Sequence, residues 1–403
     1  MKEIVIDPVT RIEGHLKFTL YTEDGIVKDA RSSGTLFRGF ELILKGKDPR
    51  DALRITPRIC GVCPVSHGVA SARALDDAFS VEVPDNGKLV RNIILGTNTV
   101  MSHATHFYAL WAPDLVNKKY ASHPAYPELQ KRFAPLAGSS YLGAVRARTI
   151  PHEIIAIFGG EMPHMVCQMP GGVTCAPGLS DIVTALTLLT RVKDFVEETV
   201  LGGSVERWLE NKSLSDVQKW MGENGHAESD LGLFIRYGPE LGLDKIGAGC
   251  GKFVSYGVFE EPGGGTWLKS GFYDGEFHPF DQGKVSEHIK HSWYQDYEGG
   301  KHPSVGVTEP QYDKEGGYSW IKSPRYEDQV TEVGPLARMI CDKDPLVLDL
   351  AKELGPSVYT RTLARLHETV SLIPKIEEWL KAIDPSKPFC AESRVPNSAT
   401  GIG

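Results

Sequence analysis

The chain of 403 residues lacks several features that mark whole classes of protein. It has no run of roughly 20 uninterrupted apolar residues, so nothing in it is predicted to span a bilayer. It has no Lys/Arg run and a net charge of −8, which argues against nucleic acid as a partner. Its N-terminus has no long apolar stretch, so we expect no signal peptide of its own. With 24% charged and 41% hydrophobic residues, the composition is that of a globular protein.

Cysteine is also scarce. The chain has 7 cysteines, an odd number. Disulfide scaffolds are shorter and denser in cysteine, so this chain is not one of them. Cys60 and Cys63 form the one C-x2-C pair, and five cysteines stand alone in the sequence: Cys167, Cys175, Cys250, Cys341 and Cys390. Because a closed tetrahedral metal site needs four ligands, any further ligands of this pair are either distant in the sequence or on another chain.

The hydrophobic pattern changes along the chain. The first 35 residues are predicted to form strands, with Asp24-Gly25 as a hairpin turn. Helices are predicted over 38–45, 51–55, 65–79, 88–111, 179–201, 345–352 and 357–383, with Ser180 as an N-cap and a kink at Pro374. We expect four parts of one integrated domain: 1–35 as a β segment, 36–246 as a helical core, 247–335 as a Gly/Pro/aromatic-rich β and loop excursion, and 336–403 as a helical segment with a tail.

The segment Arg58–His67 carries the sharpest chemical signal. Two thiolates spaced by two residues can bind one metal from a single turn, and His67 lies four residues past Cys63, on the same face if a helix has begun. The alternatives are a redox C-x-x-C, half of a structural zinc site, or two buried thiols. A redox motif belongs beside a βαβ pattern and a zinc site needs a second pair, and the sequence has neither.

Other polar residues give weaker signals. Glu13 follows a strand-like run and could relay protons beside a buried site, although a surface glutamate is the commoner case. His103 and His106 are spaced as a ligand pair on a helix, although hydrogen-bonded core histidines are more common. The glycine runs 171–172 and 263–265 fit no dinucleotide or P-loop pattern and are interpreted as turns.

Several segments match the motifs of one family in the correct order. They are Arg11–His15 (RIEGH), Arg38–Glu41, Lys45–Asp51, Arg58–Cys63 (RxCGxC), His103–Tyr108, Met169–Thr174, Tyr318–Tyr326 and Glu332–Arg338. The chain thereby resembles the large, catalytic subunit of nickel–iron hydrogenases, with the late segments similar to the membrane-bound uptake branch. The resemblance runs from about residue 5 to the end. It implies reversible heterolytic oxidation of H2 to protons and electrons.

The resemblance also implies a ligand set. The family holds a Ni–Fe centre with four thiolates from two C-x2-C motifs, and its iron carries cyanide and carbon monoxide. By motif position, Cys60 resembles the thiolate on nickel only, and Cys63 resembles a thiolate bridging nickel and iron. His67 resembles the histidine that hydrogen-bonds the bridging sulfur. Glu13 resembles the glutamate that carries protons away, and Glu41 resembles a ligand of a nearby magnesium ion.

The sequence departs from the family in two places. Ser102 stands where members often have an acidic residue, although other branches also have serine. Members continue past a segment like Thr400–Gly403 into E-A-P-R-G and D-P-C-x-x-C-x-x-H motifs, and neither motif is among these residues. Cys390 lacks that context and is interpreted as a loop thiol. We therefore expect a separate polypeptide to bring the second cysteine pair. The alternatives are a truncated sequence and a non-catalytic, hydrogenase-derived scaffold of an electron-transfer complex.

The resemblance further implies partners, a location and a fold. The chain has no cluster motif, so an iron–sulfur small subunit is required, and a membrane cytochrome or quinone-linked subunit is a further candidate. A twin-arginine signal on that small subunit would place the complex at the periplasmic face of the membrane, and the alternative is the cytoplasm. The expected fold is α+β and mainly α-helical, with a long-helix core, an N-terminal β-sheet and β-rich excursions.

Overall fold

The computed structural model describes residues 1–297 and 299–403. The chain divides into two compact units: unit 1 holds residues 1–47 and 280–331, and unit 2 holds residues 48–279 and 332–403. Within the described residues, no helix combines the length and the apolar character that crossing a membrane would require.

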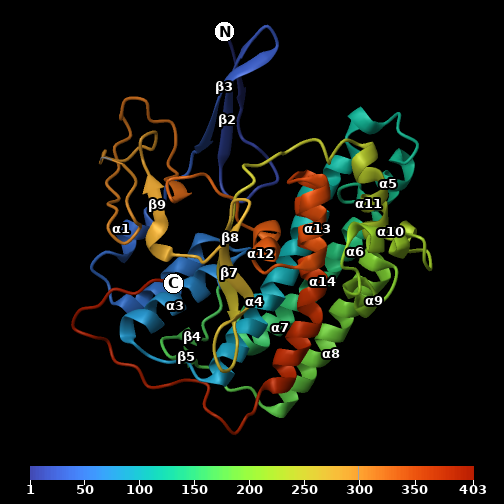
Figure 1. Ribbon diagram of the computed structural model, residues 1–403. Coiled ribbons are helices and arrows are strands. Elements are labelled where there is room, and N and C mark those ends of the chain that lie inside the picture. The colour runs from blue at the N-terminus through green and yellow to red at the C-terminus, as the bar shows by residue number, and fades with distance from the viewer. Residues whose placement is uncertain (298) are drawn as a thin grey trace. The chain divides into compact units, whose positions relative to one another are not determined.

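Unit 1 consists mainly of small antiparallel sheets. Its elements are β1 (Lys2–Ile6), β2 (Leu16–Glu23), β3 (Ile26–Gly34), α1 (Phe40–Leu44), the 3-10 turn Gln282–Lys284, β9 (Val285–His288) and β10 (Ser323–Tyr326). The first three strands form one sheet in the order β1-β2-β3, and β9 pairs with β10 (Figure 1). Asp24 and Gly25 both have positive φ, 52° and 77°, as a two-residue hairpin turn requires, which confirms that turn.

An aromatic cluster joins the two sequence segments of unit 1. Phe37 stacks on Trp320 with ring centroids 4.6 Å apart, and Tyr294 meets both rings edge-on. The backbone N–H of Trp320 also donates to the carbonyl of Gly34 at 2.8 Å. Residues 280–331 are therefore tied to the N-terminal sheet through both side chains and backbone.

Unit 2 is mainly helical. Its α-helices are α2 (Ala52–Ile55), α3 (Pro64–Phe79), α4 (Asp85–Thr105), α5 (Tyr126–Phe133), α6 (Ser139–Ala147), α7 (Thr149–Gly159), α8 (Leu179–Phe195), α9 (Val205–Leu209), α10 (Leu214–Met221), α11 (Asp230–Glu240), α12 (Pro335–Cys341), α13 (Pro345–Leu354) and α14 (Val358–Ala382). Shorter 3-10 and π turns are η1 (Pro49–Asp51), η2 (Thr56–Ile59), η3 (His106–Trp111), η4 (Ala112–Val116), η5 (Lys118–Tyr120), η6 (Val196–Leu201) and η7 (His226–Glu228). The strands are β4 (Gln168–Met169), β5 (Gly172–Val173), β6 (Phe253–Glu260), β7 (Thr266–Tyr273) and β8 (Phe277–His278).

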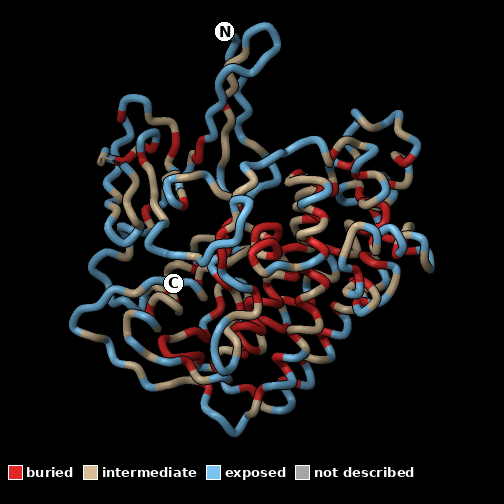
Figure 2. Tube along the Cα trace, viewed as in Figure 1, coloured by how far each residue is buried: buried red, intermediate tan, exposed pale blue. Residues whose placement is uncertain are grey.

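The core of unit 2 is centred on α4. This helix packs against α14 and α7, and α7 and α14 each pack against α8 (Figure 1). Figure 2 shows that the buried residues gather along these helices. Gly96 permits the close approach of α14, because a Cβ there would lie 3.1 Å from both Ile376 and Trp379. Helix α4 is buried nearly all round, as is typical of a helix surrounded by other helices.

The long helices match the sequence prediction except at their ends. The predicted helix 88–111 is α4 followed by a π turn, and 179–201 is likewise α8 followed by a π turn. The prediction that Ser180 is an N-cap was wrong. Gly178 is the N-cap, and its N–H donates to the Asp181 carboxylate at 2.9 Å, so the acid in the first turn supplies the capping acceptor. Pro374 lies inside α14, which continues to Ala382.

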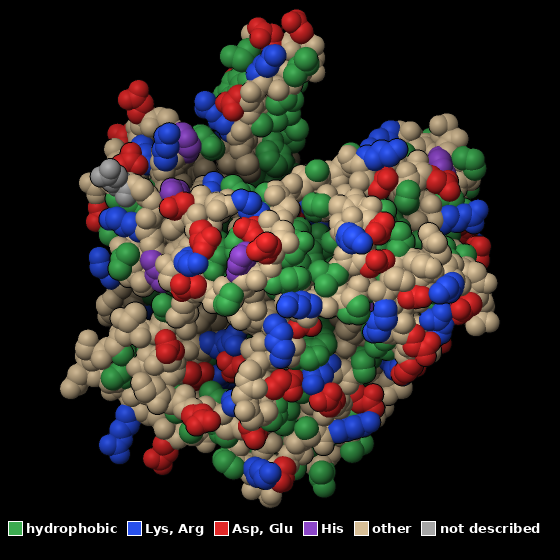
Figure 3. Space-filling view, viewed as in Figure 1, with side chains coloured by type: hydrophobic (Ala, Val, Ile, Leu, Met, Phe, Trp, Pro, Cys, Tyr) green, Lys and Arg blue, Asp and Glu red, His purple; other side chains and the backbone are tan. Residues whose placement is uncertain are grey.

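The stretch that was predicted to be loops and short strands contains the β6–β7 hairpin. Its turn holds Gly263, Gly264 and Gly265, all with positive φ, as interpreted from the sequence. Figure 3 shows Lys and Arg side chains interspersed with Asp and Glu over the face in view.

Gly171 and Gly172 form the turn between β4 and β5, as interpreted from the sequence, and Gly172 also contacts the tail. Gly172 has φ +148°, and a Cβ there would lie 2.2 Å from the carbonyl oxygen of Phe389. We expect Gly172→Ala to lower the free energy of unfolding by about 2–4 kcal/mol, since backbone strain and a steric clash add. Urea unfolding measures the change.

Gly143 supplies the control for that substitution. A Cβ at Gly143, inside α6, would make an ordinary contact of 3.6 Å with Phe195. Gly143→Ala should therefore stabilise the protein by about 0.5–1 kcal/mol through helix propensity. Trypsin cleavage after Arg394 should speed up in the Gly172 variant alone. Equal stability of the two variants would contradict the role given to Gly172.

Candidate metal centre

The cysteine pair lies on a short loop between two helices of unit 2. The 3-10 turn η2 ends at Ile59, Cys60 is extended (φ −146°, ψ 138°), and Cys63 is the N-cap of α3. Pro64 occupies the first helical position, where its fixed φ and missing N–H suit the start of a helix. The backbone N–H groups of Val62 and Cys63 both donate to Cys60 Sγ, each at 3.4 Å. The loop thus wraps two donors around one sulfur, and such donors complement the negative charge of a metal-bound thiolate.

Side chains on both flanks tie this loop to its surroundings. Thr56 Oγ1 lies 2.6 Å from Ser71 Oγ and donates to the carbonyl of His67 at 3.3 Å, which joins η2 to α3. His164 Nδ1 donates to the carbonyl of Pro57 at 3.0 Å. These contacts fix the direction in which the loop leaves η2 and enters α3.

A third support comes from α4. Asn98 is buried, with 2% of its surface exposed, and its Nδ2 donates to the carbonyl of Val62 at 3.2 Å. Sequence reasoning missed this residue. The available signal was a run of polar side chains, Thr97 to Thr99, between apolar neighbours of a helix that is buried nearly all round.

The cysteines outside the pair have a different chemistry. Burial raises the pKa of Cys167 and Cys341 to about 12 in each case, so both stay protonated at neutral pH. The Sγ of Cys341 donates to the carbonyl of Gly271 at 3.3 Å, as a thiol does. Cys390 lies in the tail, with its Sγ 3.2 Å from the carbonyl of Ala391. Burial also raises the pKa of Cys390.

The donor set of the loop fits part of a metal centre. Cys60 and Cys63 are half-buried thiols, and His67 lies one turn into α3. Across residues 1–297 and 299–403, no three His, Cys, Asp or Glu side chains form a metal-binding group. Two soft ligands and a histidine suit a thiolate-bound nickel–iron pair, and further ligands are needed to close the coordination sphere.

The two glutamates predicted to belong to the site lie in unit 1. Glu13 is exposed, in the loop between β1 and β2, where Arg11 and Gly14 have positive φ (58° and 82°). Glu41 is exposed in the first turn of α1. Burial, with the charges of Glu41 and Glu287, raises the pKa of Tyr294 to about 12.

His103 is a hydrogen-bonded core residue, the commoner of the two interpretations of its motif. Its Nε2 lies 2.6 Å from Glu368, and Arg365 donates to its Nδ1 at 2.9 Å. Because arginine only donates, Nδ1 accepts, so the ring is neutral with its proton on Nε2. Burial lowers the pKa of His103 to about 4, and burial with the charge of Arg365 lowers that of His106 to about 4.

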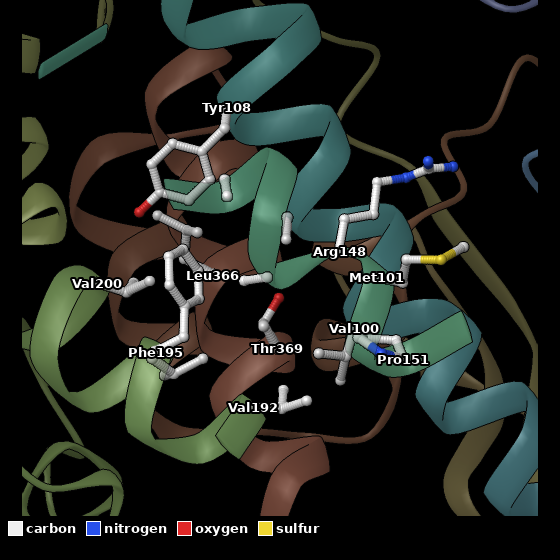
Figure 4. A pocket seen from close by; sticks show the side chains of 14 residues that line it. Val100, Met101, Tyr108, Arg148, Pro151, Val192, Phe195, Val200, Leu366 and Thr369 are labelled. Atoms are coloured by element: carbon white, nitrogen blue, oxygen red, sulfur yellow. The ribbon is translucent and has the colours of Figure 1, made fainter. Parts of the chain in front are cut away.

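A small cavity in unit 2 is separate from the cysteine loop. Figure 4 shows it among α4, α6, α8 and α14, with Val100, Val192, Phe195, Val200 and Leu366 around it. Its volume is about 30 Å³, and its lining is largely apolar. None of the predicted site residues lines it, so it is not the metal centre.

The chain is mainly helical, and its cysteine loop presents two thiols that could serve as metal ligands. The chain matches the family "Nickel-dependent hydrogenase" over residues 38–121 and 115–393, and residues 3–33 match a group described as "HoxL-like". The chain therefore belongs to the large-subunit family of nickel-dependent hydrogenases, which are nickel–iron enzymes.

Named relatives support this membership. The periplasmic [NiFeSe] hydrogenase large subunit of Desulfomicrobium baculatum is 37% identical over 100% of this chain and 79% of its own length. The uptake hydrogenase large subunit of Cupriavidus necator is 32% identical over 84% of this chain and 65% of its own length. The chain is thus similar both to uptake and to [NiFeSe] large subunits.

Solved structures support the fold. The reduced, active Ni-Fe-Se hydrogenase of Desulfomicrobium baculatum superposes with a TM-score of 0.83 at 34% identity, covering 99% of this chain and 83% of that one. The reduced enzyme of D. vulgaris Hildenborough gives 0.81 at 36% identity, with the same coverage of 99% and 83%. The predicted mainly helical α+β hydrogenase large-subunit fold is therefore confirmed.

Proposed function

We propose that this chain is the catalytic large-subunit portion of a nickel–iron hydrogenase and oxidises H2 heterolytically and reversibly. The observation that carries the proposal is the hydrogen-bonded loop of Cys60 and Cys63, because it presents two thiolate ligands in a chain of this family. A scaffold without catalysis would have no physical need for that pair.

Each predicted site residue receives one role. Cys60 would hold the nickel, Cys63 would be a thiolate shared by nickel and iron, and His67 would tune the Cys63 sulfur by a hydrogen bond. When bound, the Ni–Fe centre supplies redox and Lewis-acid chemistry for H2 cleavage, with cyanide and carbon monoxide on its iron. Glu13 accepts the proton and passes it outward. Glu41 binds magnesium through its carboxylate.

The remaining parts come from outside these residues. Two more thiolates would complete the centre, and we propose that they come from a second C-x2-C pair outside these residues. An iron–sulfur small subunit takes the electrons singly, with a membrane cytochrome or quinone-linked subunit as the next acceptor. We place the complex at the periplasmic face of the membrane, reached through the signal of the small subunit.

The test is to purify the complex from its native host under anaerobic conditions. We expect about one nickel per large subunit, with iron in excess of nickel because the small subunit carries iron–sulfur clusters. We also expect exchange of D2 with water protons to give HD, which reports heterolytic cleavage without any electron acceptor. Mass spectrometry of the same sample identifies the chain that carries the second cysteine pair. A complex with all partners present and no nickel would overturn the proposal and favour the scaffold.

A further inference from the structure

The peptide unit between Val62 and Cys63 carries hydrogen bonds at both of its ends. Its carbonyl, that of Val62, accepts from Asn98 Nδ2 at 3.2 Å, and its N–H, that of Cys63, donates to Cys60 Sγ at 3.4 Å. A peptide unit is planar and trans, so its C=O and N–H point in opposite directions. Holding the carbonyl toward α4 therefore turns the N–H toward the sulfur.

Asn98 is well placed to hold that peptide. It lies on α4, the most central helix of unit 2, and it is 2% exposed. Because burial already restricts the Asn98 side chain, making the hydrogen bond costs little further conformational entropy. The bond therefore holds the Val62 carbonyl in a fixed position. Gly61, between the two cysteines, has no atom near the position of a Cβ, so the loop gets no packing support there.

We propose that Asn98 is a positioning residue for the thiolate pair: it fixes the Val62–Cys63 peptide so that the N–H of Cys63 points at Cys60 Sγ. This inference rests on the proposed function, because it assigns that sulfur to a metal. A hydrogen bond to a coordinated thiolate draws charge from the sulfur and restricts its direction. Residues that orient ligands in this way typically affect metal affinity by about 10- to 100-fold.

The same helix supplies a matched control. Asn92 is also buried, at 3% exposed, and its Nδ2 donates to a backbone carbonyl, that of Glu260, at 2.7 Å. It therefore shares with Asn98 the residue type, the helix, the burial and the kind of bond, and differs in the partner. Substitutions at the two positions should lower the stability of the fold by similar amounts. Only those at Asn98 should change nickel binding.

The experiment compares Asn98→Ser and Asn98→Leu with Asn92→Ser and Asn92→Leu in the purified complex. Serine is too short to reach the carbonyl of Val62, and leucine has the size of asparagine without its donor. We expect the Asn98 variants to lose nickel to a chelator about 10- to 100-fold faster than wild type and to show shifted g-values in the nickel EPR spectrum. The Asn92 variants should keep both properties.

Hydrogen exchange tests the positioning without the metal. In metal-depleted complex, the amide of Cys63 should exchange faster in the Asn98 variants and at the wild-type rate in the Asn92 variants. Unchanged exchange and EPR spectra in the Asn98 variants would overturn the inference, as would equal effects at both positions. A wild-type complex without nickel would overturn the proposed function instead, and the exchange rates would still decide the role of Asn98.

Discussion

Cys63→Ser should abolish nickel binding while leaving the fold intact. Serine replaces a soft thiolate by a hard hydroxyl that stays protonated at neutral pH, so the bridging ligand is lost. Cys63 is the N-cap of α3 without a side-chain capping bond, and serine is among the favoured N-cap residues. We expect H2 oxidation to fall more than about 100-fold. Losing a metal ligand should cost more than losing a residue that hydrogen-bonds a ligand, which costs about 10- to 100-fold. Nickel analysis and thermal unfolding of the same sample separate metal loss from unfolding.

The exposed Cys250 provides the control for this experiment. Its Sγ lies 3.6 Å from the carbonyl of Lys252, and it is far from the C-x2-C loop in sequence. Cys250→Ser should keep both nickel and activity. If Cys63→Ser retained nickel at the wild-type level, Cys63 would not be a ligand. The proposed function would then lose the observation that carries it.

The sequence predicted the elements whose signals are local. The hairpin at Asp24-Gly25, the helix after Pro64 and the β6–β7 turn each follow from residues that lie together in the chain. The helices α5 to α7 and α9 to α11 were not predicted. They are short, and short helices owe their stability mainly to tertiary packing. The predicted N-cap of α8, Ser180, was wrong because Gly178, whose N–H is capped by Asp181 three residues later, takes that position instead.

The sequence offers candidate ligands for the site, but it does not indicate the residues that support their loop. Cys60 and Cys63 lie on one short loop, and His67 lies in the first turn of the helix that follows, so these three residues are neighbours in the sequence. Asn98 and His164 reach the same loop from positions more than 30 residues away in the chain, as their contacts with Val62 and Pro57 require. Such pairings depend on how α3 packs against α4, and no local pattern encodes them.

A buried ionic cluster in unit 2 shows the same limit of sequence reasoning. Glu368 on α14 is 0% exposed, and its two oxygens bind Arg338 Nε and Nη2 at 2.6 Å each. It also accepts from His103 Nε2 at 2.6 Å, and Arg365 donates to the other ring nitrogen at 2.9 Å. Burial alone would raise the pKa of Glu368, but Arg338 and His103 outweigh it and lower that pKa. One carboxylate therefore serves two guanidinium groups, directly for Arg338 and through His103 for Arg365.

Glu368→Gln should destabilise the protein by about 3–5 kcal/mol, the usual cost of removing one partner from a buried ion pair. Glutamine keeps the shape of the side chain, but it leaves Arg338 and Arg365 without a counter-charge and directs an NH2 group at one of its cationic or N–H neighbours. Burial lowers the pKa of Arg365 to about 10 even with the carboxylate present. Denaturant unfolding at pH 7 measures the loss. Glu378→Gln on the same helix, where Lys375 pairs at the surface, should change stability by less than about 0.5 kcal/mol.

The pH dependence distinguishes a charge effect from a packing effect at Glu368. Its folded-state pKa is lowered, so its contribution is full above the unfolded value of about 4.3 and disappears as pH falls below it. The stability difference between wild type and Glu368→Gln should therefore shrink as pH falls below about 4.3, because Glu368 then takes up a proton on unfolding of the wild type. His103 adds a second acid-sensitive step, because its pKa of about 4 lies below the unfolded value of about 6.5, so wild type loses stability as pH falls between them. A difference that stays constant from pH 7 to pH 3 would mean that packing, and not charge, accounts for the role of Glu368.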